Sequence, residues 1–182
     1  MIIPKTIETV PSYEGKIINI KVDKLSRDGE DTFFREVAVV SDSVAIVAID
    51  KQSRVLLIQQ YRHPMGCPVW EIPAGRIDVE NETPKQTALR ELREETDVVA
   101  KHIEQLTLFG NSVGWTTEKT YVFVAHELET VSEYKRHDEE ADIEKKWIPM
   151  LEALDMVKSG VISDAKTIIG LTLAKERLVQ SG

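Results

Sequence analysis

Alternating apolar and polar residues mark the first third of the chain as β structure. Residues 15–25 (GKIINIKVDKL) alternate as a half-buried strand does, and the turn-like cluster SRDGED follows them. Three more runs, at residues 33–40, 43–49 and 55–62, continue the strand pattern. We therefore expect antiparallel strands in this region, with a small sheet of its own before a boundary near residue 42.

The pattern changes to a helical period between Thr83 and Thr96. Thr83 can cap this helix together with Gln86, and Pro84 stands in the first turn, where its missing N–H costs no hydrogen bond. Farther along, the chain predicts two strands and two helices, at residues 103–109, 120–128, 150–158 and 164–178. Strands mixed with helices predict a layered α/β architecture.

Composition and charge narrow the classes of function. The chain has 182 residues, 42% hydrophobic and 30% charged, which is typical of a folded domain and unlike disordered or fibrous proteins. Its 23 basic and 31 acidic residues leave a net charge of −8, which argues against nucleic acid or an anionic membrane as partner. A polyanionic substrate would need a local positive charge, for which a metal ion is the usual device.

Cysteine usage and the chain start give two further expectations. Cys67 is the single cysteine, which excludes an intrachain disulfide and a zinc site built from thiolates. The N-terminal residues MIIPKTIETV lack the pattern of a signal peptide, and no apolar run approaches the length of a membrane span. We therefore expect a cytoplasmic protein.

The candidate chemistry is concentrated on one face of the helix at 83–96. At 100° per residue, Glu91, Glu94 and Glu95 lie within an arc of about 100°. Like charges this close weaken a helix, and a hard divalent cation with oxygen ligands, Mg²⁺ above all, would compensate them. The alternative is a solvated acidic face that the intervening arginines neutralise.

Two neighbouring positions favour the metal site over the solvated face. The PAG turn before the helix can bring the backbone carbonyl of Ala74 beside the three carboxylates. Glu82 is placed where it could bind Arg90 and fix the loop against the helix.

Residues 75–98 resemble the Nudix box, G-x5-E-x7-R-E-U-x-E-E-x-G-U, in which U is a large aliphatic residue. The matching positions are Gly75, Glu82, Arg90, Glu91, Leu92, Glu94, Glu95 and Val98. Six residues rather than five separate Gly75 from Glu82, and Asp97 stands where the box has glycine. Neither departure touches a metal ligand, and aspartate tolerates the left-handed conformation common at a helix C-terminus.

Outside the box, four segments resemble the ADP-ribose pyrophosphatase branch of that family: YEGKIINIKVDKL, VLLIQQYRHP, VWEIPAG and ISDAKTIIGLTLA. This branch implies a Nudix-type α/β/α sandwich with a mixed sheet, plus a small N-terminal antiparallel β-sheet. It further implies that residues 1–42 form an N-terminal β subdomain for dimerisation and the base pocket. Residues 43–182 would then be the Nudix hydrolase domain, and the protein a homodimer.

The resemblance implies Mg²⁺-dependent hydrolysis, with Mn²⁺ as a possible substitute, of the pyrophosphate bond in a nucleoside diphosphate sugar. The first choice of substrate is ADP-ribose, which would yield AMP and ribose 5-phosphate. The implied metal ligands are the Ala74 carbonyl, Glu91, Glu94 and Glu95, and Glu94 also counts as catalytic. Gly75, Glu82 and Arg90 are the implied structural residues of the box.

Six further residues are candidates for catalysis or substrate binding. Arg62 can bind the diphosphate in a forked contact, because a guanidinium matches phosphate oxygens in pairs. Glu71 is a candidate for orienting the metal or the substrate, and a surface glutamate at a strand end is the alternative. The resemblance implies a loop glutamate as general base, with Glu139 the first choice and Glu140 the second. It also implies Phe34 and Arg35 for recognition of the base.

Three alternatives remain open at this point. Val113 stands where the ADP-ribose branch usually has a proline, so another sugar nucleotide such as GDP-mannose is an alternative substrate. A catalytically silent Nudix module that binds a nucleotide is the second alternative, although no box carboxylate is missing. The third is a plain α/β interaction domain, which leaves the arrangement from PAG to Glu95 unexplained.

Overall fold

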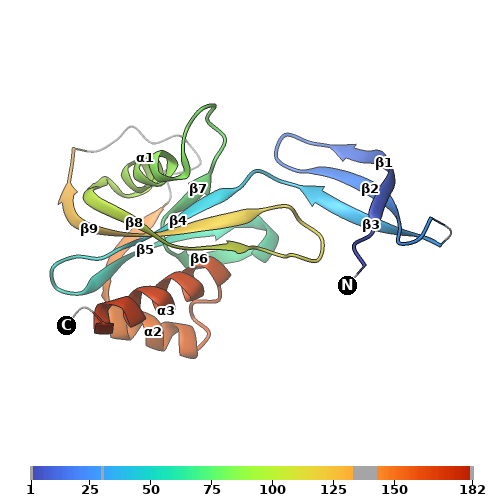
Figure 1. Ribbon diagram of the computed structural model, residues 1–182. Helices are drawn as coiled ribbons and strands as arrows, with labels where there is room; N and C mark the ends of the chain where they lie inside the picture. The colour runs from blue at the N-terminus through green and yellow to red at the C-terminus, as the bar shows by residue number, and fades with distance from the viewer. Residues whose placement is uncertain (1, 30, 133–142, 181–182) are drawn as a thin grey trace. The chain divides into compact units, whose positions relative to one another are not determined.

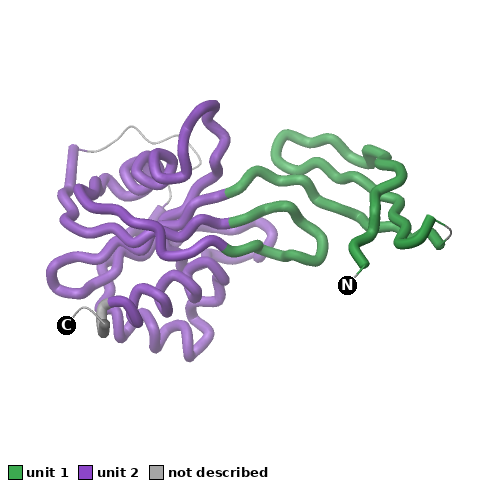
Figure 2. The backbone as a smooth tube through the Cα atoms, in the orientation of Figure 1, with its two compact units in different colours: residues 1–42, 109–119 green, residues 43–108, 120–182 purple. Residues whose placement is uncertain are grey.

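The computed structural model describes residues 2–29, 31–132 and 143–180. The chain divides into two compact units, residues 1–42 with 109–119 and residues 43–108 with 120–182 (Figure 2). The first unit thus includes the segment 109–119, which the sequence-based division places in the second domain.

The first unit contains a three-stranded antiparallel sheet in the order β1-β2-β3. Its strands are β1 (Lys5–Glu14), β2 (Asn19–Ser26) and β3 (Thr32–Val39). The strand expected at 15–25 starts later than predicted, because the Gly15 N–H donates to the Ile18 carbonyl, 3.1 Å away, and forms a turn. β1 was not predicted; all ten of its residues are exposed, so no buried face imposes an alternating pattern.

The second unit holds two sheets, in the orders β7-β4-β9-β8 and β10-β5-β6. The strands are β4 (Ser43–Ala48), β5 (Arg54–Arg62), β6 (Cys67–Glu71), β7 (Ala74–Arg76), β8 (Val98–Gly110), β9 (Lys119–Thr130) and β10 (Glu144–Pro149). β4 pairs in parallel with β9 and antiparallel with β7, so the sheet is mixed. The helices are η1 (His63–Met65), α1 (Pro84–Thr96), α2 (Met150–Lys158) and α3 (Ala165–Gln180).

Helices cover both faces of the mixed sheet (Figure 1). Val44, Ile46 and Ala48 of β4 share a buried core with residues of α1. On the opposite face, Gly170 of α3 approaches β4 so closely that a Cβ there would lie 2.9 Å from Val47 Cγ2. Because successive strand residues point to opposite faces, these contacts define the α/β/α layers. The expected sandwich and the separate N-terminal sheet are therefore confirmed.

The helix at α1 agrees with its sequence prediction, whereas the short strands do not follow from the pattern. β6 and β7 together hold only eight residues, too few for a period to show. Both lead directly into the candidate site, as described below. Within the described part of the chain, no helix is long and apolar enough to cross a membrane.

Candidate active site

Both ends of α1 are fixed, which sets the direction of its acidic face. At the start, Thr83 Oγ1 accepts from the Gln86 backbone N–H and the Gln86 side chain accepts from the Thr83 backbone, forming the predicted capping box. At the end, Asp97 adopts the left-handed conformation with φ of +59°. Its carboxylate is 2.6 Å from Lys145 Nζ of β10. Aspartate therefore fills the glycine position of the box and adds a contact that glycine could not make.

The Arg90 guanidinium contacts three carboxylates on or beside α1. Its Nε donates to Glu82 Oε1 over 3.1 Å, and its Nη1 lies 2.8 Å from Glu91 Oε1 and 2.9 Å from Glu94 Oε2. Thr87 Oγ1 donates to the other Glu82 oxygen. Glu82 and Arg90, which the sequence places in reach of each other, are thus in contact and tie the loop before α1 to the helix.

Glu91 and Glu95 are packed against the short strand β7. Glu95 Oε2 accepts a hydrogen bond of 2.9 Å from the Ala74 N–H, and a Cβ on Gly75 would overlap the Glu91 carboxylate. Both glutamates are buried, Glu91 with a residue exposure of 9% and Glu95 with 6%. Burial raises the pKa of Glu91, and it raises the pKa of Glu95 to about 8. The ionised forms of these two carboxyl groups are therefore poorly solvated unless a cation is bound.

A second charged network lies at the end of β6. Arg62 Nε and Nη2 donate to the two oxygens of Glu71 over 2.7 and 2.8 Å. Lys166 Nζ, from α3, contacts Glu71 Oε2 as well and lies 2.9 Å from Asp164 Oδ1. Burial opposes ionisation of Glu71 most strongly, yet the two cations together hold its pKa below the usual range. Glu71 is thus a buried carboxylate that stays charged.

Sequence reasoning missed Lys166 and Asp164, although both stand in the segment ISDAKT that precedes the last helix. The aspartate before a helical run is a recognisable capping signal, but nothing in the sequence relates it to Glu71, which lies 95 positions before Lys166. A third missed residue is Gln60, whose Nε2 is the one buried side-chain nitrogen or oxygen without a hydrogen-bond partner in the described residues. Strand alternation places it on the face of β5 that carries Arg62.

We expect Glu71→Gln to lower the free energy of unfolding at pH 7 by roughly 2 kcal/mol, because it uncouples a buried carboxylate from two cations. A depressed pKa contributes stability that is complete above the unfolded value of about 4.5 and is lost as the pH falls through the folded value. Urea unfolding between pH 7 and pH 3 should therefore show the difference between wild type and variant shrinking in acid. A difference that stays constant with pH would contradict the charged network, and Glu152→Gln on exposed α2 is the control.

The other sequence-predicted residues fall elsewhere. Phe34 and Arg35 lie on β3 in the first unit, where the Arg35 guanidinium sits 4.9 Å from the centre of the Phe33 ring and donates to the Phe34 carbonyl. The Phe34 side chain is 61% exposed. Glu139 and Glu140, the two choices for a general base, lie outside the described residues.

The donor set around α1 suits a hard cation. All of its side-chain donors are carboxylate oxygens, next to the backbone of Ala74. Among the described residues, no three acidic, histidine or cysteine side chains already converge as a ready ligand cluster. Arg90 binds oxygens of Glu91 and Glu94 that a bound cation would share. The residues thus fit Mg²⁺ by the kind of donor that they offer, and Arg90 supplies positive charge next to them.

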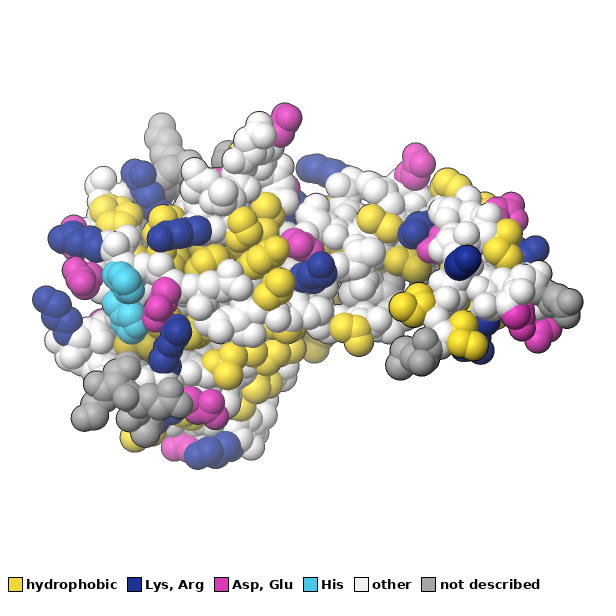
Figure 3. All heavy atoms as spheres, in the orientation of Figure 1, with side chains coloured by type: hydrophobic (Ala, Val, Ile, Leu, Met, Phe, Trp, Pro, Cys, Tyr) yellow, Lys and Arg dark blue, Asp and Glu magenta, His cyan; other side chains and the backbone are white. Residues whose placement is uncertain are grey.

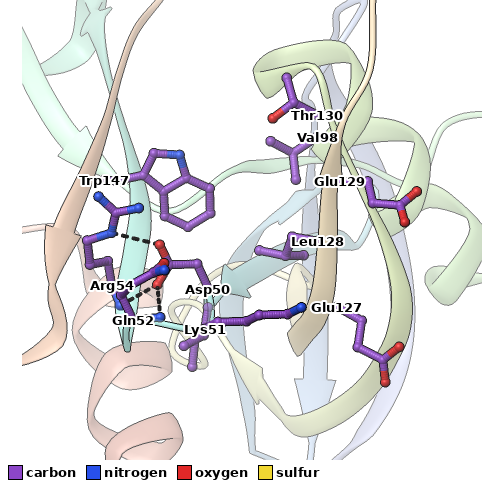
Figure 4. A pocket seen from close by; sticks show the side chains of 11 residues that line it. Asp50, Lys51, Gln52, Arg54, Val98, Glu127, Leu128, Glu129, Thr130 and Trp147 are labelled. Carbon is purple, nitrogen blue, oxygen red and sulfur yellow. Dashed lines mark hydrogen bonds and ion pairs between the residues drawn. The ribbon is translucent and has the colours of Figure 1, made fainter.

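A separate hollow of about 340 Å³ opens at the carboxyl ends of β4 and β9 (Figure 4). Its floor includes Trp147, with the Arg54 guanidinium 5.9 Å from the indole centre. Asp50 binds that guanidinium over 2.7 Å, so the central charges are paired with each other. Gly75 instead pairs with Val44 near the start of β4, which separates this hollow from the carboxylates of α1.

A family model and curated relatives match most of this chain. Residues 40–169 match the model of the NUDIX domain. The chain is 34% identical over 163 residues to an ADP-ribose pyrophosphatase of Bacillus subtilis, covering 90% of this chain and 88% of that one. It is 35% identical over 167 residues to an ADP-ribose pyrophosphatase of Mycobacterium tuberculosis, covering 92% and 81%.

A solved structure supports the same fold. The crystal structure of an ADP compounds hydrolase superposes with a TM-score of 0.85 over 98% of this chain and 96% of that one, at 19% sequence identity. The domain match spans the strands and helices that hold the carboxylates of α1 and the network at Glu71. The chain therefore belongs to the Nudix family.

Proposed function

We propose that the protein hydrolyses the pyrophosphate bond of a nucleoside diphosphate sugar, with ADP-ribose as the first choice and AMP and ribose 5-phosphate as products. The observation that carries this proposal is the packing of Glu91 and Glu95 against Gly75 and Ala74 of β7, with Glu94 joined to Glu91 through Arg90. The names of the two bacterial relatives support the choice of substrate.

The cation of this proposal is Mg²⁺, with Mn²⁺ as a substitute. Glu91, Glu94, Glu95 and the Ala74 carbonyl would hold it. When bound, it supplies positive charge that offsets the charge developing on the attacked phosphate. The net charge of −8 makes this local compensation necessary for an anionic substrate.

Residues of the chain itself would bind the diphosphate, position the acidic face and remove the proton from water. Arg62 is held by Glu71 through one edge of its guanidinium, and its side chain is 40% exposed, so the other edge is available to the diphosphate. Glu82 and Arg90 keep the acidic face in place. A water molecule must lose a proton as it attacks phosphorus, which requires a general base.

We propose Glu139 as that base, with Glu140 as the second choice. Glu139→Gln or Glu140→Gln should lower kcat by about 10²–10³-fold while changing KM little, because a general base acts on the attacking water in the transition state. Steady-state kinetics on both variants and on Glu144→Gln, an exposed residue of β10, measure this. Unchanged turnover in both variants would remove Glu139 and Glu140 from the mechanism.

We also propose that residues 1–42 dimerise the protein. The sheet of the first unit exposes large apolar side chains, several visible on one face in Figure 3. They include Ile7, Val10 and Tyr13 of β1 and Ile20 of β2, together with Ile17 and Ile18 between these two strands. Exposed apolar groups gathered on one small sheet are typical of an interface. Light scattering should give twice the chain mass of 20.6 kDa, and the double variant Ile7→Asp, Val10→Asp should give the single mass. A wild-type monomer at micromolar concentration would contradict the proposal.

A substrate panel tests the reaction. The purified protein is incubated with Mg²⁺ and ADP-ribose, ADP-glucose, GDP-mannose, NADH or dinucleoside polyphosphates, and products are separated by chromatography. Release of AMP and ribose 5-phosphate as the preferred reaction supports the first choice. Preference for GDP-mannose would favour the alternative suggested by Val113. Hydrolysis of none, with either Mg²⁺ or Mn²⁺, would favour a silent nucleotide-binding module.

A further inference from the structure

Lys166, in the first turn of α3, is the second cation bound to Glu71. Arg62 binds both oxygens of that carboxylate, and the lysine Nζ shares Oε2 with it. The side chains of Glu71 and Lys166 are 2% and 18% exposed. Because cations occupy both of its oxygens inside the protein, the Glu71 carboxylate is held in one orientation.

The backbone that carries Lys166 is itself attached to the end of β6. Asp164 Oδ2 accepts from the Thr167 N–H over 3.0 Å and so caps the first turn of α3. The hydroxyl of Thr167 accepts a 2.9 Å hydrogen bond from the backbone N–H of Ile72, the residue after Glu71. Thr167 is fully buried. The lysine is therefore placed against Glu71 by backbone contacts and not by the reach of its side chain alone.

Arg62 is the outer member of this network. Its Nε and Nη2 are bound to Glu71, and its Nη1 has no hydrogen-bond partner among the residues that the structure describes. A planar guanidinium that is held along one edge presents the opposite edge in a fixed direction. Any rotation of the Glu71 carboxylate would therefore change the direction of the free Arg62 edge.

We propose that Lys166 is a positioning residue for diphosphate recognition, acting through Glu71 to hold the free edge of Arg62 toward the phosphates. The inference rests on the proposed function and adds a residue to it. Without the Lys166 ammonium group, the cation that contacts both Asp164 and Glu71 is missing. The Glu71 carboxylate then gains freedom to rotate about its side-chain bonds. The guanidinium would then sample several directions, and the substrate would have to select one of them.

The first test separates binding from turnover. Lys166→Met should raise KM for ADP-ribose about 10-fold with kcat within about 2-fold of wild type, because uniform binding is lost. Lys166→Arg, which restores the charge, should recover KM to within about 3-fold. Lys158→Met is the matched control, since that lysine is 76% exposed on α2 and pairs with Asp155 at the surface. A KM in Lys166→Met equal to that of the control would overturn the proposal.

The second test asks whether the effect passes through Glu71. In a Glu71→Gln background, Lys166→Met should change KM by less than about 2-fold, because the intermediary has already lost its charge. If the KM change of the double variant equals the product of the two single changes, the lysine acts independently of Glu71. That result would also overturn the proposal.

A third measurement does not depend on activity. The Arg62 Nε–H, assigned by its loss in Arg62→Lys, should exchange with solvent slowly in wild type, since it lies 2.7 Å from Glu71 Oε1. Lys166→Met should accelerate this exchange at least about 10-fold, and unchanged exchange would overturn the inference. If that variant does not fold by circular dichroism, Lys166→Gln takes its place. Failure of wild type on every substrate would refute the proposed function, while the exchange data would still test the lysine.

Discussion

Glutamine in place of Glu95 is expected to lower kcat by about 10²–10³-fold at saturating Mg²⁺. Glu95 Oε2 accepts a 2.9 Å hydrogen bond from the Ala74 N–H, and the residue is buried. Bulk water therefore cannot easily take the place of this carboxylate as a ligand of the cation. Glutamine keeps the shape and can accept the same hydrogen bond from Ala74. It removes the negative charge that the proposed cation requires.

The same substitution should leave the fold intact or make it more stable. Burial raises the pKa of Glu95 to about 8, which means that the site disfavours the ionised form when no cation is bound. Thermal melts without metal should therefore show no loss for Glu95→Gln near pH 8. Mg²⁺ should raise the melting temperature of wild type but not of the variant. Turnover at the wild-type rate would refute the catalytic assignment of the acidic face.

The second large effect is expected from a single methyl group at Gly75. A Cβ at this position would overlap the Glu91 carboxylate, so Gly75→Ala must push that side chain away from β7. Glu91 is also bound by Arg90, and its displacement would disturb the Arg90 contacts with Glu94 and Glu82 as well. We expect kcat to fall at least about 10²-fold, because small displacements of catalytic groups carry large kinetic costs.

Gly114→Ala is the matched control for this prediction. A Cβ at Gly114 would meet no atom within 4 Å, so the substitution should leave kcat unchanged. Wild-type activity in Gly75→Ala would show that the close approach of β7 to Glu91 is not needed for turnover. A crystal structure of the variant would identify the displaced carboxylate directly.

Local sequence patterns were sufficient to predict α1, the helix that carries the acidic residues. The spacing of Glu91, Glu94 and Glu95, the capping pair at Thr83 and the Gly75–Glu82–Arg90 positions all lie within a stretch of 24 residues, 75–98. The shared face of the three glutamates follows from helical geometry alone, whereas Gly75, Glu82 and Arg90 were identified by their positions in the Nudix box. Asp97 could be assigned to the left-handed conformation for the same reason, because a helix end is a local event.

Interactions between distant segments could not be found in that way. Arg62 and Glu71 were each recognisable as polar residues near strand ends, but their pairing depends on the register of β5 against β6. Lys166 reaches the same carboxylate from 95 residues away, and only the packing of α3 on the sheet brings it there. β6 and β7 are too short to produce a pattern, and the exposed β1 has no buried face to produce one.

Sequence alone thus predicted the acidic face, from the periodicity of one helix, and the fold family, from the resemblance of residues 75–98 to the Nudix box. The tertiary structure decided what those carboxylates touch. It set the backbone of β7 against Glu91 and Glu95, and it joined Arg62, Glu71 and Lys166 into one network. The physical reason is that packing brings together residues whose separation along the chain carries no information about their separation in space.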